Sequence, residues 1–153
     1  MDESNIAQAY EEMSTTNPNL KNLDRLVGTW RVSGPDIAGQ IRYEWMEGGF
    51  FLVQHVDLDH GGRHIKGIEI IGYELPFGAD KPSEHIKSHW FGNSPDTLEY
   101  TYEVDDETLT IWGGEKGSPA YYTGKWSADG NTLTGEWVYP GGGGYQATSI
   151  RIK

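Results

Sequence analysis

Histidine is the residue type in this chain best suited to proton transfer or metal binding, and all five histidines lie between residues 55 and 89. A histidine beside a carboxylate can act as a general base, and three histidines together can bind a divalent metal. We identify His55 and His89 as candidate catalytic residues and His64 as a candidate ligand-binding residue. The alternative for all three is a solvated or hydrogen-bonded surface histidine. No metal site is predicted, because His85 and His89, four residues apart, fall on a predicted strand, where they are too far apart to chelate one ion.

The orientation of His55 can be predicted from strand periodicity. It shares a strand face with Phe51 and Val53, and these two apolar side chains should not face water. The sequence therefore predicts that His55 points inward, where its ring nitrogens would need a partner such as His64, Tyr43 or a bound ligand.

Two carboxylates, Asp57 and Glu69, lie on the same two predicted strands as His55 and His64. A carboxylate inside an apolar barrel would have a raised pKa and could move protons. The alternative is a solvated surface position, since the chain has 23 Asp and Glu residues and most must be exposed.

Aromatic side chains are numerous, with six Trp and nine Tyr, and many lie in the middle of predicted strands. They can form the core, or they can line a cavity that receives a flat or amphipathic molecule, and both alternatives stay open. The predicted ligand-binding residues are Tyr43, Trp45, His55, His64, Trp90, Tyr100, Tyr102 and Trp137.

Composition excludes several classes of function. The 153-residue chain has no Cys, so disulfides and thiolate chemistry are excluded. Its net charge of −11 argues against nucleic acid and anionic membranes as partners. No apolar run reaches membrane-spanning length and the first residues lack a signal-peptide pattern, so a cytoplasmic location is expected. The expected partner is a small molecule, with a homodimer left open.

The elements that must position these residues are mostly strands. From Gly28 onward the apolar pattern has a period of two, and glycine-rich turns separate roughly ten runs. These runs cover residues 28–34, 39–47, 50–58, 63–74, 84–92, 97–104, 107–113, 119–128, 131–139 and 144–152. One longer loop covers residues 75–83. Because sequential antiparallel strands leave exposed edges unless the sheet closes, we predict an all-β up-and-down barrel with an interior cavity.

The N-terminal part is predicted to be helical. Residues 1–16 form an acidic extension, in which Ile6, Tyr10 and Met13 share one helical face that would cover an end of the barrel. A second helical segment starts at Asn17-Pro18, and the barrel domain covers 17–153.

The segment Leu26-Val27-Gly28-Thr29-Trp30 resembles the Gly-x-Trp start of the calycin barrels, which include lipocalins, fatty-acid-binding proteins and nitrobindins. In those families the Trp closes the barrel base and a basic residue of the last strand packs across it. The resemblance implies these roles for Gly28, Trp30 and Arg151. Residues 48–54, 70–74, 89–94 and 141–145 resemble an uncharacterised bacterial family of calycin-like barrels, which implies a fold and no assigned reaction. Nitrobindins hold haem through a His near the C-terminus, whereas this chain has none after His89, so no cofactor is predicted.

These observations predict a barrel that binds a small apolar or amphipathic molecule in its interior. One alternative is a cofactor-free enzyme, such as an isomerase, cyclase or hydrolase, that uses a His with a buried carboxylate or Tyr. Another is a structural or interaction protein whose cavity is collapsed. Cavity volume and the direction of the His side chains distinguish the three.

Overall fold

The computed structural model describes residues 17–153. The predicted extension over residues 1–16, with Ile6, Tyr10 and Met13 on its inner face, lies outside the described residues. Within the described part of the chain, no helix has the length and apolar character needed to cross a membrane.

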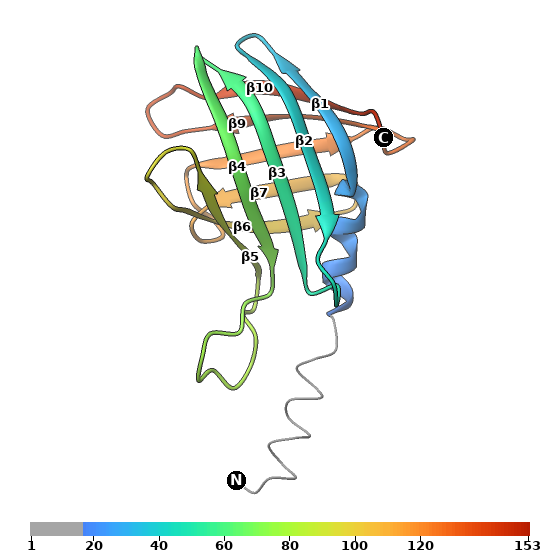
Figure 1. Cartoon of the computed structure of the whole chain (residues 1–153), viewed down its shortest axis with the longest axis vertical. Coiled ribbons are helices and arrows are strands. Elements are labelled where there is room, and N and C mark those ends of the chain that lie inside the picture. Colours follow the sequence, from blue (N-terminus) through green and yellow to red (C-terminus); the bar gives the residue numbers. More distant parts are fainter. Residues whose placement is uncertain (1–16) are drawn as a thin grey trace, which may run out of the picture.

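Ten antiparallel strands form a closed barrel, in which each strand pairs with its sequence neighbours and β1 also pairs with β10 (Figure 1). This confirms the predicted fold class. The strands are β1 (Gly28–Gly34), β2 (Ile37–Trp45), β3 (Phe51–His60), β4 (Arg63–Gly72), β5 (Ile86–Gly92), β6 (Leu98–Asp105), β7 (Thr108–Gly113), β8 (Tyr121–Trp126), β9 (Thr132–Val138) and β10 (Tyr145–Arg151).

Tight turns set the register between neighbouring strands. Between β3 and β4 the turn has two residues, Gly61 and Gly62, with φ of 59° and 80°. Glycine adopts this left-handed conformation without steric cost, which suits the two-residue hairpin. His60 therefore pairs with Arg63, and each earlier residue of β3 has a defined partner on β4.

A short helix closes one end of the barrel. The 3-10 helix η1 (Pro18–Leu26) starts after Asn17, whose side chain accepts a hydrogen bond from the backbone of the second helical residue. Leu20, Leu23 and Leu26 are three residues apart, which places them on one face of a helix with three residues per turn. All three are buried and belong to the core cluster, so η1 seals the base next to β1 (Figure 1).

The contact predicted at the base is confirmed. The Arg151 guanidinium lies 4.2 Å from the centroid of the Trp30 ring, and the two residues are paired across β1 and β10. The Trp30 indole nitrogen donates to the Leu26 carbonyl at 2.8 Å, and Arg151 donates to the carbonyls of Arg25 and Val27. These contacts join the first and last strands, β1 and β10, to η1, an arrangement consistent with a calycin-like barrel.

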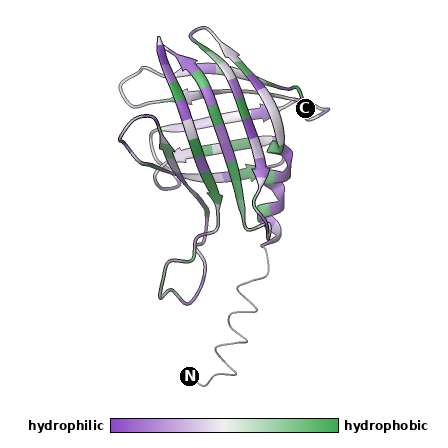
Figure 2. Ribbon diagram, viewed as in Figure 1, coloured by the Kyte–Doolittle hydropathy of each residue, from purple (hydrophilic) through white to green (hydrophobic). Residues whose placement is uncertain are grey.

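The predicted register of β3 is wrong by one residue. Leu52, Gln54 and Val56 are buried, whereas His55 points outward and lies 2.9 Å from Glu44. Both faces of β3 carry apolar residues, so periodicity alone could not separate them. The alternating bands along β3 and β4 in Figure 2 include strongly apolar positions at the lower ends of both strands.

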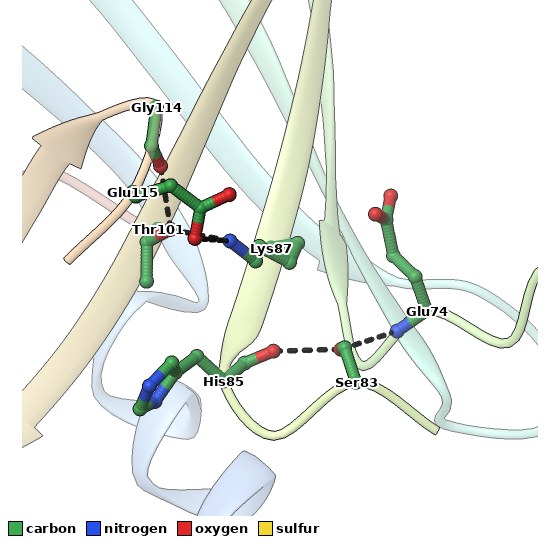
Figure 3. Close-up of polar contacts among 7 residues, drawn as sticks. All are labelled: Glu74, Ser83, His85, Lys87, Thr101, Gly114 and Glu115. Carbon is green, nitrogen blue, oxygen red and sulfur yellow. Dashed lines mark hydrogen bonds and ion pairs between the residues drawn. The ribbon is translucent and has the colours of Figure 1, made fainter. Parts of the chain in front are cut away.

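The predicted long loop follows β4 and is pinned at its neck. The Ser83 hydroxyl donates to the His85 carbonyl at 2.7 Å and accepts from the Glu74 backbone at 3.0 Å (Figure 3). Outside the barrel nearby, Lys87 donates to Thr101 and forms an ion pair with Glu115 at 2.8 Å. These polar contacts lie on the outer surface of β5 and β6 and do not involve the barrel interior.

Candidate functional site

The barrel encloses a cavity of about 420 Å³, to which all ten strands contribute side chains. The lining is largely aliphatic and aromatic. The base of the barrel below the cavity is filled by the core cluster that includes η1. The cavity therefore excludes a collapsed interior, which was one of the three alternatives drawn from the sequence.

The far end of the cavity is its mouth. His60 and Arg63 line it from the β3–β4 hairpin, and Asp96 lines it from the segment before β6. The His60 and Tyr145 rings lie 4.2 Å apart at this end. Arg63 and Asp96 are exposed, so the mouth is the polar and solvent-facing end of the cavity.

Aromatic rings form one wall of the cavity. Trp137 lies 5.8 Å from Tyr100 and 5.7 Å from Tyr122, with tilted ring planes in both pairs. Tyr139 stacks on Trp137 at 5.9 Å nearer the mouth. Such a wall offers large apolar contact area together with phenolic hydroxyl groups.

Glycines within the strands make room for this wall. A Cβ atom at Gly92 would lie 2.6 Å from the Trp90 indole, and one at Gly67 would lie 2.8 Å from it. Gly124 and Gly135 leave equivalent space for the Tyr122 ring. A glycine inside a strand often marks such a close approach, and here it lets the rings lie against the barrel wall instead of filling the cavity.

A group of buried polar side chains, which we call the inner polar cluster, consists of Tyr43, Gln54, Glu69, Ser88 and Tyr102. All five are buried, and they come from five consecutive strands, β2 to β6. Gln54 pairs with Tyr43 on one side and with Glu69 on the other, and its side chain donates to the Tyr43 hydroxyl at 2.7 Å. Tyr102 donates a hydrogen bond to Glu69. Every member except Ser88 lines the cavity.

Burial dominates the electrostatics of this cluster. It raises the pKa of Glu69 to about 7, although the hydrogen bond from Tyr102 and the nearby Ser88 hydroxyl favour the charged form. The Ser88 hydroxyl lies beside this carboxylate without meeting normal hydrogen-bond geometry to any partner in residues 17–153. Burial and the nearby Glu69 charge raise the pKa of Tyr102 well above its usual value. The cluster therefore holds one carboxyl group that can exchange its proton near neutral pH.

Among residues 17–153, Glu69 has no basic partner. None of the ion pairs formed by residues 17–153 includes Glu69. Arg63 lies on the same strand, but six residues away, which is about 20 Å along a strand. The closed end of the cavity is thus acidic, whereas the cationic side chain is at the mouth.

Most of the predicted ligand-binding residues lie in the barrel interior. Tyr43, Trp90, Tyr100, Tyr102 and Trp137 line the cavity. Their part in ligand binding remains a prediction.

Trp45 does not line the cavity. It packs against the core at the base, and its indole nitrogen donates to Asp24 of η1 at 2.6 Å. Its position favours a structural role in holding η1 against the barrel.

The predicted histidines lie outside the barrel. His64 is 2.7 Å from Asp57, and His89 is 2.6 Å from Glu74. His55 also points outward, toward Glu44. The expectation that His55 points into the interior is wrong. Within the described residues no three His, Asp or Glu side chains gather as a metal ion would require.

Sequence reasoning identified Glu69 but missed Gln54 and Ser88, and it overlooked His60 at the mouth. The Gly61-Gly62 turn pairs residues at equal distances from it, which aligns Gln54 with Glu69 on one face. Because both faces of β3 carry apolar residues, this pairing did not show which face is buried. Comparison of the chain with protein-family models and with curated proteins gives no match, so the candidate site rests on this geometry.

Proposed function

We propose that this barrel binds a small amphipathic molecule in its interior cavity. The observation that carries the proposal is the cavity of about 420 Å³, apolar and aromatic along its walls and polar at its closed end. Ligand sites in proteins commonly have volumes of about 300–1,000 Å³ and combine apolar walls with a few buried polar groups. The mouth residues provide a route from solvent.

A pair of matched variants tests the proposal. Ala147 on β10 lines the cavity, whereas Ala38 on β2 is exposed and does not line it. Ala147→Trp should fill part of the cavity and weaken binding of the apolar fluorescent probe N-phenyl-1-naphthylamine by at least about tenfold. Ala38→Trp adds the same group outside and should leave binding unchanged.

Fluorescence titration of the folded proteins gives the affinities, and circular dichroism checks that each variant is folded. Absence of probe binding to the wild-type protein would contradict the proposal. Equal affinities for both variants would place the probe outside the barrel and contradict it too.

A second candidate function is acid–base catalysis on the bound molecule. The histidines do not support it, but the hydrogen-bonded Glu69 and Tyr102 inside the cavity do. Ionised Glu69 could take a proton from a carbon next to a ketone and return it to another carbon, as in an isomerase. Loss of carbon-bound proton signal from an enolisable cyclic ketone in D₂O, followed by NMR, should be faster with the wild-type protein than with Glu69→Gln. Equal rates would remove this candidate.

A further inference from the structure

We propose that the cavity selects molecules carrying a basic amine, which enter amine-first and form an ion pair with Glu69 at the closed end. This inference rests on the proposed ligand-binding function and names the ligand class. It starts from a charge without a partner, because Glu69 is 6% exposed and forms no ion pair with any residue from 17 to 153. A buried carboxyl group must either keep its proton or meet a cation.

An amine provides the cation through a balanced proton transfer. The proton on the Glu69 carboxyl oxygen moves to the amine nitrogen, which becomes an ammonium group beside a carboxylate. The O–H bond breaks and the N–H bond forms, and no other reactant is needed. A ligand that arrives already protonated pairs directly with the ionised carboxylate.

Hydrogen-bond acceptors beside Glu69 fit the three donors of an ammonium group. The Tyr43 hydroxyl oxygen takes one hydrogen bond from Gln54 and keeps capacity for another. The second oxygen of the Glu69 carboxylate is a further acceptor, and both Glu69 and Tyr43 line the cavity. Ser88 is buried beside the carboxylate but does not line the cavity, so it takes no part in this contact.

The surroundings favour a cation over an anion. The faces of Tyr and Trp rings attract cations, and Tyr100 and Trp137 stand together in the cavity wall with centroids 5.8 Å apart. The cationic side chain of the lining, Arg63, is about 20 Å away along β4. A carboxylate-bearing ligand would therefore be repelled by Glu69 if it entered head-first. The net charge of −11 also raises the local concentration of cations around the protein.

Three molecules with one skeleton test the inference: 4-phenylbutylamine, 4-phenylbutan-1-ol and 4-phenylbutanoate. Each is titrated at pH 7.5 against the full chain carrying N-phenyl-1-naphthylamine. We expect the amine to bind at least about tenfold more tightly than the alcohol, with the carboxylate weakest. In Glu69→Gln the amine should lose that advantage, while the affinity for the alcohol should stay within about threefold.

The matched control is Glu136→Gln, which removes the same charge from an exposed position of β9. It should keep the full preference for the amine. Equal binding of amine and alcohol to the wild-type protein, or an amine preference that survives Glu69→Gln, would overturn the inference. In either case the proposed function would stand, whereas failure of every molecule and of the probe to bind would overturn both.

A second measurement does not depend on a variant that folds. In protein with ¹³C-labelled glutamate carboxyl groups at pH 6, below the raised pKa of Glu69, we expect a protonated Glu69 carboxyl group, and addition of 4-phenylbutylamine should move its signal to the ionised position. The alcohol should leave it in place. A Glu69 signal that stays in the protonated position when the amine is saturating would overturn the inference.

Discussion

Glu69 is a carboxylic acid whose surroundings differ strongly from water. It sits in an apolar barrel with a hydrogen bond from Tyr102 and no basic partner within residues 17–153. Burial opposes ionisation more strongly than the hydrogen bonds favour it, so the raised pKa follows. Such a group reduces stability when it is ionised, which is why a perturbed carboxyl group in a cavity marks a candidate functional site.

The first prediction concerns the pH dependence of stability. The pKa of Glu69 rises from 4.5 to about 7 on folding, so the folded state binds more protons than the unfolded state between these values. Stability should therefore fall as pH rises through this range, by about 3 kcal/mol in total from this group. Glu69→Gln should lack that loss, so the variant should gain stability relative to the wild type between pH 5 and pH 8.

Urea unfolding at both pH values measures the effect. Glu136→Gln, with its carboxyl group in solvent, should follow the wild-type profile. If the free energy of unfolding of Glu69→Gln and of the wild type changed with pH in parallel, ionisation of Glu69 would not reduce stability, which would contradict the prediction.

At the scale of elements, register and helix packing decide which side chains reach the cavity. The register of β3 turns Gln54 inward and His55 outward, so two neighbouring polar residues have different surroundings. The spacing of the η1 leucines aligns them over the base. Two predictions test these placements.

The β3 register predicts unequal effects of two adjacent substitutions. Gln54→Ala removes the hydrogen bond to the Tyr43 hydroxyl inside the barrel and should lower the free energy of unfolding by about 1–3 kcal/mol. His55→Ala changes a solvent-exposed contact with Glu44 and should have little effect. Denaturant unfolding distinguishes the two, and the reverse order of effects would mean that His55 faces inward.

The seal formed by η1 predicts a large effect of one leucine. Leu23 is fully buried against the base, so Leu23→Ala should cost about 2–5 kcal/mol of unfolding free energy. Asn22→Ala, at an exposed position of the same helix, should leave stability nearly unchanged. Thermal and denaturant unfolding check both, and a small effect of Leu23→Ala would mean that η1 is not part of the core.

At the scale of the whole molecule, closure links the first strand to the last. β1 pairs with β10, and the Arg151 guanidinium covers Trp30 while donating to carbonyls next to η1. This junction removes the sheet edges and closes the base beneath the cavity. The cavity is therefore a property of the closed barrel and not of any pair of strands.

The closure predicts that two tryptophans respond differently to the same substitution. Trp30 is buried at the junction, so Trp30→Ala should lower the free energy of unfolding by about 3–5 kcal/mol. Trp112 on β7 faces outward with Lys116 over its ring, and Trp112→Ala should cost clearly less. Denaturant unfolding gives the comparison. Equal losses of unfolding free energy in the two variants would contradict a special role of the β1–β10 junction in stability.

The sequence by itself determined the ten strands, the long loop and the helical segment that starts at Asn17-Pro18. These features depend on local periodicity and turn residues, which are readable along the chain. The Trp30–Arg151 contact was implied by the resemblance to the calycin barrels. The sequence also pointed to Glu69 and to most of the aromatic side chains that line the cavity.

Only the tertiary structure decided which face of β3 is inside and which polar groups meet there. Phe51 and Val53 on one face are as apolar as Leu52 and Val56 on the other, so burial of either face was consistent with the pattern. Pairing with both neighbouring strands broke that tie, because Gln54 lies between Tyr43 and Glu69 in the closed sheet. A shift of one residue exchanges the inside and outside of a strand. The titratable group in the interior is therefore Glu69 and not the predicted His55.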